Sequence, residues 1–521
     1  MKKSLQMLFG LGLTALSTMQ IWAQSAEKIK MTTTAPKGTA LTLTLAATDG
    51  QVRIDAGDGT MQKQTVPATV EKAMAITVRP TVDNATITLE GAILLFDCTN
   101  TQTTALDLTE ARSVSLLRCN NNHLTTLDVT PLERLISLQC GSCKLETLTL
   151  GEKPELREII VNHNKLQTID VRKAPKLQGL SIDFNQIKSL DLGQNGSLEQ
   201  LYCKKNPLAT IPMQQLPKLT TLSCEAIGIS ELDLSHNPLI KKIYCGDNKI
   251  KKLDLSRATK LEELNCKLNP ITELDLSKCT ELSELYCFEN ELTTLSLANN
   301  KKLTVLSAGA NQLKEIDLSR LTKLKEVSLS FNKLTQLRLE NCPSIEALAL
   351  DHNELTELDL SGTTHLQGLS LSNNKIAGEA AVRLVRTLPD RSGDEKGILM
   401  CYNKAEFPDD TEENNFPEEA LKLAKDRNWI ASDGETPLPL ANPAITGEET
   451  STHDLTIDAS GCVTLSDYYA AQLYSADGML LSSYAHGAPI SLNQMPHGLY
   501  LLRVTKPNGV VYTARLLWHV R

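Results

Sequence analysis

A register of cysteines raises the first question about chemistry in this chain, because its members are spaced by 21 residues or a multiple of 21. A cysteine can act as a nucleophile, ligate a metal, form a disulfide or fill apolar space. After Cys287 the register continues as Ala308, Leu329, Leu350 and Leu371. Because leucine replaces cysteine at equivalent sites, the register predicts a buried apolar filler. The cysteines of this ladder are Cys98, Cys119, Cys140, Cys203, Cys224, Cys245, Cys266 and Cys287.

The oxidation state of these cysteines is a separate question. Stacked turns would place neighbouring ladder cysteines at a conceivable Cα spacing for disulfides, but parallel side chains do not bring their Cβ atoms close enough. Exported chains normally pair their cysteines, so our prediction of free buried thiols runs against that rule. Cys140-Gly-Ser-Cys143 has the spacing of a redox dithiol. Such motifs need a helix N-terminus in a βαβ context, and the repeat already accounts for both positions, so we interpret them as structural.

A second register carries aspartate in the phrase Leu-Asp-Leu. A column of carboxylates could bind calcium, and stacked like charges are unfavourable without relief. We favour the alternative that each side chain accepts a hydrogen bond from the backbone of the following turn, as Asx side chains do. The members of this register are Asp128, Asp170, Asp191, Asp233, Asp254, Asp275, Asp317 and Asp359.

Motifs for catalysis are absent from the sequence. The 9 histidines are scattered, without H-x-x-x-H or a His, Cys and carboxylate cluster at metal-ligand spacing, so no metal site is predicted. There is no G-x-S-x-G, phosphate-binding or dinucleotide-binding loop. We therefore expect a protein that is not an enzyme and has no cofactor, and a hydrolase hypothesis has no motif behind it.

These registers belong to a repeat of 21 residues that continues without gaps from about Cys98 to Lys375. Its row is approximately L-x-x-L-x-C/L-x-x-N-x-L-x-x-L-D-L-S-x-x-x. Between Asn122 and Asn374, only Cys143 and Ile227 break the asparagine register. A unit this short cannot bury its own leucines, so the turns must stack around one core. The L-x-C/L segment alternates as a short parallel strand, and the asparagine amide can satisfy backbone groups where the strand enters the loop. The pattern predicts a leucine-rich-repeat solenoid of about 65–70 Å, with strands ~4.8 Å apart.

The repeat length and the stacked cysteines together resemble the internalin J type of leucine-rich-repeat surface protein. The resemblance covers residues 93–405, a little over half of the chain. It implies cell-surface adhesion and partner binding, whereas the period alone predicts only a scaffold.

The register one place before each ladder cysteine points away from the core, because strand side chains alternate. It holds a tyrosine on every second turn in the middle of the solenoid, and phenylalanines stand near the same edge. Exposed aromatics on a rigid sheet suit protein or glycan recognition. The rings could equally pack on one another and only stabilise the sheet, and both interpretations stay open. The candidate partner-binding residues on this concave face are Tyr202, Tyr244, Tyr286, Phe184, Phe288 and Phe331.

Residues 1–23 have the pattern of a secretory signal, with two lysines, a short apolar run and Ile21-Trp22-Ala23 before the expected cleavage point. That run is too short and too polar for a membrane anchor, and no later stretch is long enough and apolar enough to span a bilayer. The net charge is −9, and removal of the two leader lysines makes it −11. The absence of a basic block argues against nucleic acid and anionic lipid as partners.

The segments that flank the solenoid do not follow the 21-residue repeat. Residues 24–92 alternate apolar and polar, which predicts a small β-sandwich cap. Its Asp55-Ala-Gly-Asp-Gly-Thr60 resembles the W-G-D-G-T turn of polycystic-kidney-disease-type modules, with Ala56 at the tryptophan position. It has too few spaced carboxylates for a calcium loop, so we predict a tight hairpin. Residues 406–448 are interpreted as a helical cap followed by a linker rich in Pro, Gly and acidic residues.

Residues 449–521 are again β-rich, with a hairpin at Gly478. Their order, spacing and terminal position closely resemble the type IX secretion sorting domain of Bacteroidetes. Its pattern P-x-G-x-Y-x-x-R-V is matched through Gly498, Tyr500 and Arg503. The resemblance implies the type IX secretion machinery as a partner, removal of this domain, and a location attached to the outer-membrane surface or outside the cell. An unrelated small sandwich, for example one that binds sugar, is the alternative.

Together these features predict a mostly β chain in which a solenoid is flanked by small β-sandwich domains. We expect a monomeric, exported adhesin that binds a protein or glycan on another cell or in a biofilm matrix. Such an adhesin is expected to act in host attachment, interbacterial adhesion or biofilm formation, and thereby in virulence. A structural scaffold of the cell envelope without an external ligand is the alternative.

Overall fold

The structure is a computed structural model that describes residues 27–402 and 413–431, and the strands between 455 and 518. The chain divides into two compact units, Met1–Pro437 and Leu438–Arg521. The expected secretory signal and the linker after residue 431 lie outside the described residues.

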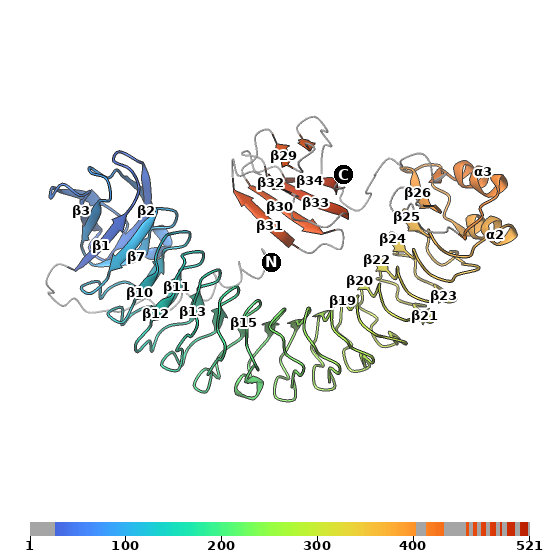
Figure 1. Cartoon of the computed structure of the whole chain (residues 1–521), viewed down its shortest axis with the longest axis horizontal. Helices are drawn as coiled ribbons and strands as arrows, with labels where there is room; N and C mark the ends of the chain where they lie inside the picture. Colours follow the sequence, from blue (N-terminus) through green and yellow to red (C-terminus); the bar gives the residue numbers. More distant parts are fainter. Residues whose placement is uncertain are drawn as a thin grey trace. The chain divides into compact units, whose positions relative to one another are not determined.

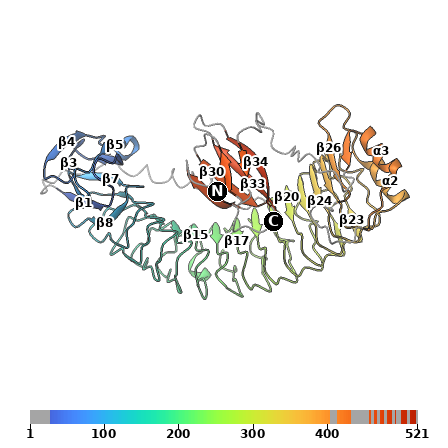
Figure 2. The same ribbon diagram turned by 45° about the horizontal axis from the view of Figure 1, so that its top comes forward.

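The middle of the first unit is a curved leucine-rich-repeat solenoid of about 13 turns with 21-residue spacing, as predicted (Figure 1). Each turn adds one short strand to a parallel sheet that lines the concave side (Figure 2). Neighbouring strands pair in register, so that Leu201 lies opposite Leu222, and Leu222 opposite Ile243. The strands are β9 Leu116–Arg118, β11 Ser137–Gln139, β13 Glu158–Ile160, β14 Gly179–Ser181, β15 Gln200–Tyr202, β16 Thr221–Ser223, β17 Lys242–Tyr244, β18 Glu263–Asn265, β19 Glu284–Tyr286, β20 Val305–Ser307, β22 Glu326–Ser328, β24 Ala347–Ala349 and β25 Gly368–Ser370.

The opposite side of the coil has little regular structure. Two short parallel sheets form there, one from β10 Thr126–Asp128 and β12 Thr147–Thr149, the other from β21 Glu315–Asp317 and β23 Gln336–Arg338. The remaining turns follow the coil through loops. The regular surface of the solenoid is therefore its concave face.

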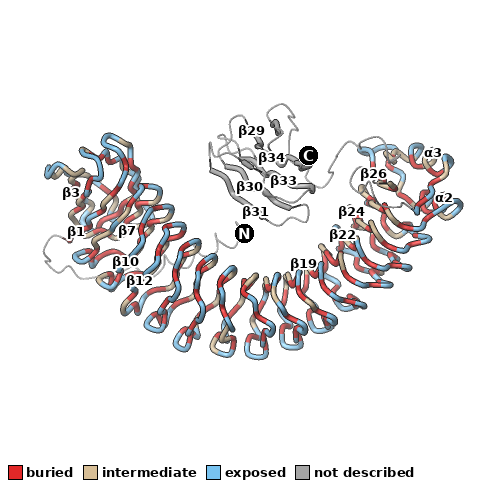
Figure 3. The backbone as a smooth tube through the Cα atoms, viewed as in Figure 1, coloured by how far each residue is buried: buried red, intermediate tan, exposed pale blue. Residues whose placement is uncertain are grey.

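The hydrophobic core runs continuously through the turns, and the exposed residues lie on the surface of the coil (Figure 3). The middle residue of each strand points inward, and Leu201, Leu222 and Leu264 have no exposed surface. Burial of one such side chain contributes about 1.5–3 kcal/mol. All eight ladder cysteines are also fully buried, and their thiols are not in disulfides.

The asparagine register ties each turn to the one before it. In Asn269 the side-chain Nδ2 donates to the carbonyls of Cys266 and Lys267 in its own turn and to that of Cys245 in the preceding turn, at 3.0–3.1 Å. Its Oδ1 accepts from the N–H of Ile250 at 3.0 Å. The predicted role of the amide in satisfying turn backbone is confirmed.

Three turns lack that asparagine and change their backbone in the same way. Thr101, Cys143 and Ile227 stand at the position, and the residue after each of them is left-handed. The φ angles are 53° at Gln102, 71° at Lys144 and 86° at Gly228. The residue before the position is left-handed in every turn, with or without the asparagine, as at Ser142 and Leu268. The amide therefore keeps the residue that follows it out of the left-handed region.

The aspartate register forms the predicted Asx hydrogen bonds. In each of its eight members Oδ1 accepts from the N–H two residues later, at 2.8–3.1 Å. The amide and hydroxyl of Ser256 lower the pKa of the Asp254 carboxyl. Within the described ranges, no group of three or more His, Cys, Asp or Glu is arranged to hold a metal ion.

The first turn is covered by two antiparallel sheets. The order of the first is β4 Met61–Thr65, β3 Gln51–Asp55, β6 Thr86–Glu90, β1 Lys28–Thr33 and β8 Thr103–Asp107. In the second, β2 Leu41–Ala47 lies between β5 Met74–Val78 and β7 Ile93–Asp97, and β7 pairs in parallel with β9. The solenoid sheet thus begins inside the cap.

The Asp-Gly turn of the cap is the predicted tight hairpin, between β3 and β4. The Asp55 carboxylate accepts from the N–H groups of Gly57, Asp58 and Gly59 at 2.8–3.0 Å. These three bonds fix the conformation of the loop. The likeness to polycystic-kidney-disease modules stays a prediction.

The last turns replace outer loops by helices α2 Glu379–Thr387 and α3 Glu418–Asp426. The sheet extends beyond residue 405, where we expected the solenoid to end, because β26 Gly397–Met400 pairs in parallel with β27 Trp429–Ala431. A Cβ on Gly397 would lie 2.5 Å from the indole of Trp429, so only glycine fits there. Among the described helices, none is long and apolar enough to cross a membrane.

The second unit is described by its backbone strands alone. β30 Ala470–Ser475 lies between β31 Leu480–Ala485 and β33 Gly498–Thr505, and β33 pairs with β34 Val511–Trp518. A smaller sheet holds β28 Leu455–Ile457, β29 Cys462–Leu465 and β32 Ile490–Ser491. Gly498, Tyr500 and Arg503 all fall on β33, whereas Gly478 lies outside the described residues.

Candidate partner-binding face

The three tyrosines lie at the centre of the concave sheet. Tyr202, Tyr244 and Tyr286 end strands β15, β17 and β19 and are half-buried. The strands between them place Ser223 and Asn265 at the same register. Two strand spacings put successive rings about 9–10 Å apart, beyond the 4.5–7 Å of a ring pair. Each ring therefore stands on the sheet with polar neighbours and does not stack on the next tyrosine.

Carboxylates surround the polar tips of these rings. The Tyr286 hydroxyl donates to Glu284 at 3.2 Å, and the Tyr202 hydroxyl donates to Gln200 at 3.4 Å. Burial, followed by the charge of Glu284, raises the pKa of Tyr286 above its usual value. Burial and then Glu263 likewise raise the pKa of Glu284. The tyrosine stripe is thus a partly desolvated, acidic strip of surface.

Two of the predicted phenylalanines lie apart from the stripe, on a ridge where the strands run into the turns. Phe184 is 37% exposed and Phe331 is 48% exposed. Each stacks on a histidine of the neighbouring turn, with ring centroids 4.2 Å apart in both the His163–Phe184 and Phe331–His352 pairs. All four residues are left-handed, with φ between 54° and 58°. The backbone thus turns these rings outward.

Lysine side chains lie close to two of the phenylalanine rings. Lys204 Nζ lies 5.4 Å from the centroid of the Phe184 ring. Phe288 is less exposed and one position nearer the sheet, with Lys267 Nζ 5.1 Å from its ring centroid. Burial and then Lys204 lower the pKa of His163, which favours the neutral form of its ring. Such lysine–ring contacts contribute about 0.5–1 kcal/mol at exposed sites.

The structure brings the six predicted residues onto one side of the solenoid. The three tyrosines form one group on the sheet, and the three phenylalanines form a second group where the strands run into the turns. Phe184 and Phe331 are seven turns apart, which corresponds to ~34 Å of sheet, so a ligand that touches both must be large. Sequence reasoning missed the histidines. The signal was available, because His163 precedes Phe184 and His352 follows Phe331 by one 21-residue turn in the same register.

The ridge also carries an exposed leucine. Leu268 is 38% exposed and lies between Asp247 and Glu289 on the neighbouring turns. With Asn290 and Glu291 these residues line an open hollow of about 380 Å³. An apolar centre with acidic borders is a surface that a macromolecular partner can contact.

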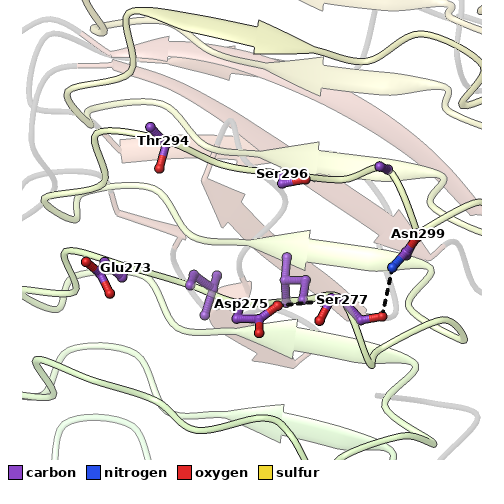
Figure 4. A pocket seen from close by; sticks show the side chains of 9 residues that line it. Glu273, Asp275, Ser277, Thr294, Ser296 and Asn299 are labelled. Carbon is purple, nitrogen blue, oxygen red and sulfur yellow. Dashed lines mark hydrogen bonds between the residues drawn. The ribbon is translucent and has the colours of Figure 1, made fainter.

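A second hollow, of about 330 Å³, lies between two outer turns (Figure 4). It occurs where Ser296 stands at the aspartate position of the repeat. Asp275 accepts from the N–H of Ser277 at 2.9 Å, and Asn299 donates to the Ser277 carbonyl at 3.1 Å. These polar groups serve the turn backbone. The N–H and hydroxyl of Ser277 lower the pKa of the Asp275 carboxyl, which makes this carboxylate a weaker general base.

No protein-family model matches the chain, and no curated protein does. Among solved structures, it is similar to the functional domain of InlJ from Listeria monocytogenes, which is described as including a cysteine ladder. The identity is 24% and the TM-score 0.52, over 85% of this chain and 94% of that one. A leucine-rich-repeat protein of Leptospira interrogans is also 24% identical with a TM-score of 0.52, over 56% of this chain and 81% of that one. These likenesses show the fold, an internalin-like leucine-rich-repeat solenoid.

Proposed function

We propose that this protein is a cell-surface adhesin whose solenoid binds a protein or glycan partner through its concave face. The observation that carries the proposal is the placement of Tyr202, Tyr244 and Tyr286 on a rigid parallel sheet, each ring separated from the next by a strand with a small polar residue. A ring of this kind offers apolar area and a polar tip at low cost in conformational entropy.

The ridge supports the same proposal. Large apolar side chains with 37–48% exposure, such as Phe184 and Leu268, contribute little to the core. Exposed apolar groups bordered by polar ones are typical of interaction sites. The internalin-like fold suits a role in protein interaction, since it presents an extended concave surface. A mixture of apolar and acidic groups along ~34 Å of sheet favours a macromolecule over a small metabolite.

The cellular location is part of the proposal. We infer export from the signal pattern of residues 1–23, followed by passage through the type IX secretion machinery with the β-rich C-terminal unit as the sorting domain. Deletion of residues 449–521 is expected to leave the protein in the periplasm, as measured by protease accessibility on intact cells. Normal surface display of the deleted protein would contradict the inferred route.

A structural role in the cell envelope is the second candidate. It is favoured by ion pairs that join exposed side chains of neighbouring turns, such as Lys176–Glu155 at 2.7 Å and Lys241–Glu262 at 2.6 Å. Each exposed pair contributes about 0–1 kcal/mol, so together they reinforce the coil moderately. This candidate needs no external ligand.

The experiment that separates the two candidates uses the full chain on glycan arrays and in pull-downs from cells and biofilm matrix. The test variant replaces Tyr202, Tyr244 and Tyr286 by alanine, and the control replaces Lys260, an exposed residue in a turn outside the strands, by alanine. Adhesion predicts a partner that the control retains and the tyrosine variant loses, with the circular dichroism spectrum unchanged. If the wild-type chain captures no partner on any of these samples, the scaffold candidate is favoured.

A further inference from the structure

The first ladder turns contain a group of three thiols that differs from the rest of the ladder. Cys119 Sγ lies 2.8 Å from Cys140 Sγ, and Cys140 Sγ lies 3.5 Å from Cys143 Sγ. All three side chains are fully buried. For the later ladder cysteines that the structure describes, from Cys203 to Cys287, no such contact joins thiols of neighbouring turns. The repeat alone therefore does not produce the contact.

The extra thiol comes from the interrupted asparagine register. Cys143 Sγ donates to the carbonyl of Cys119 at 2.9 Å, as Asn164 Nδ2 donates to the carbonyl of Cys140 one turn later at 2.8 Å. Cys143 thus takes over one hydrogen bond of the missing amide, and it carries a sulfur atom to the ladder. The neighbouring Cys119 and Cys140 thiols lower the pKa of Cys143, against the effect of burial.

We propose that Cys119, Cys140 and Cys143 form an oxidisable centre that holds one disulfide, with Cys140 as the obligatory partner and Cys119 or Cys143 as the other. Two S–H bonds break and one S–S bond forms, while two electrons and two protons pass to a disulfide-bearing oxidant that is reduced to two thiols. The remaining thiol can attack the bond and exchange it, because both neighbours lie within 3.5 Å of Cys140.

The chemistry favours sulfur–sulfur bonding over a metal. The described residues contain no set of three or more ligands with metal-binding geometry. Sulfur atoms 2.8 Å apart are already near the 2.03–2.05 Å of a disulfide. Because the centre is closed to solvent in the folded chain, we expect oxidation while the chain folds. This inference does not depend on the adhesin proposal, so either can fail without the other.

The test is oxidative refolding of the full chain. The protein is unfolded in guanidinium with reductant, refolded with oxidised glutathione, and then alkylated under denaturing conditions and weighed. Of the 13 cysteines, we expect two to escape alkylation, and peptide mapping should join Cys140 to Cys119 or to Cys143. Complete alkylation, or disulfides spread along Cys203–Cys287, would overturn the proposal.

Four variants make the test specific. Cys140→Ser should abolish the disulfide, whereas Cys119→Ser should retain it through Cys143. Cys143→Asn restores the asparagine of the repeat and should retain the bond through Cys119. Cys245→Ser, an ordinary ladder position, should behave as wild type. Circular dichroism of each variant separates loss of the bond from loss of folding, and a disulfide that persists in folded Cys140→Ser contradicts the assignment.

Discussion

The interior and the concave face of this solenoid follow different rules, although both are read from the same 21-residue row. Inside, leucine, asparagine and cysteine recur because every turn meets the same neighbours. On the face, the residue beside the ladder cysteine varies freely, with Tyr244 on one turn and Asn265 on the next. Stacking specifies the regular positions of the interior, so the residues that could recognise a partner lie in the registers that stacking leaves unconstrained.

The largest effect should come from the interior asparagines. Asn269→Ala removes the bonds to three carbonyls and one N–H, and each buried group left unsatisfied costs about 1–3 kcal/mol. We expect a loss of roughly 3 kcal/mol or more in the free energy of unfolding, measured in urea. Cys143→Asn is the matched control, because it installs an asparagine in the same register and should not destabilise. Equal losses in both variants would contradict the role assigned to the amide.

The next effect tests close packing at the end of the sheet. Gly397→Ala places a methyl group against the Trp429 indole, where an added Cβ would be 2.5 Å from the nearest ring carbon. We expect destabilisation of about 1–3 kcal/mol, with a fall in the melting temperature. Gly368→Ala on the neighbouring strand is the control, because an added Cβ there meets nothing within 4 Å. A Gly397→Ala protein as stable as that control would show that the cap is loosely packed.

A separate effect should appear in the pH dependence of stability, at a carboxyl on the concave side. Burial raises the pKa of Asp183 to about 7, although Lys204 opposes the shift. A carboxyl whose pKa is higher in the folded state favours folding while it is protonated, and this contribution is lost as pH rises from about 4 through 7. We therefore expect wild type to lose stability over that window relative to Asp183→Asn, whose amide oxygen can still accept from the Lys204 N–H. Parallel stability curves for the two proteins would contradict the shift.

The interior was predictable from the sequence because periodicity and burial carry the same signal. The leucine, asparagine and aspartate registers each have the structural role that their residue types indicated, and the Asp55 turn is the expected hairpin. The helical cap at the end of the solenoid was also expected, but β27, which continues the sheet beyond residue 405, was not, because the helices α2 and α3 interrupt the period. A search for a 21-residue repeat does not find turns of a different length.

The candidate site was predictable only in part. The tyrosine stripe follows from strand alternation, but the ridge depends on left-handed residues such as His163 and Phe184, and many residue types adopt that backbone conformation one place before the asparagine position. The thiol contact between Cys119 and Cys140 was also outside the reach of the pattern. It arises where Cys143 replaces an asparagine, and a repeat predicts what its regular members do, not what an exception does to its neighbours.

The central claim is that the concave face binds a partner, whereas the regular asparagine and leucine registers of the interior stabilise the fold. Its most direct test is the dissociation constant of the captured partner for wild type and for the variant with alanine at positions 202, 244 and 286. We predict at least a tenfold weaker interaction, about 1.4 kcal/mol or more, with the unfolding midpoint changed far less than by Asn269→Ala. Unaltered affinity in the folded tyrosine variant would contradict the account.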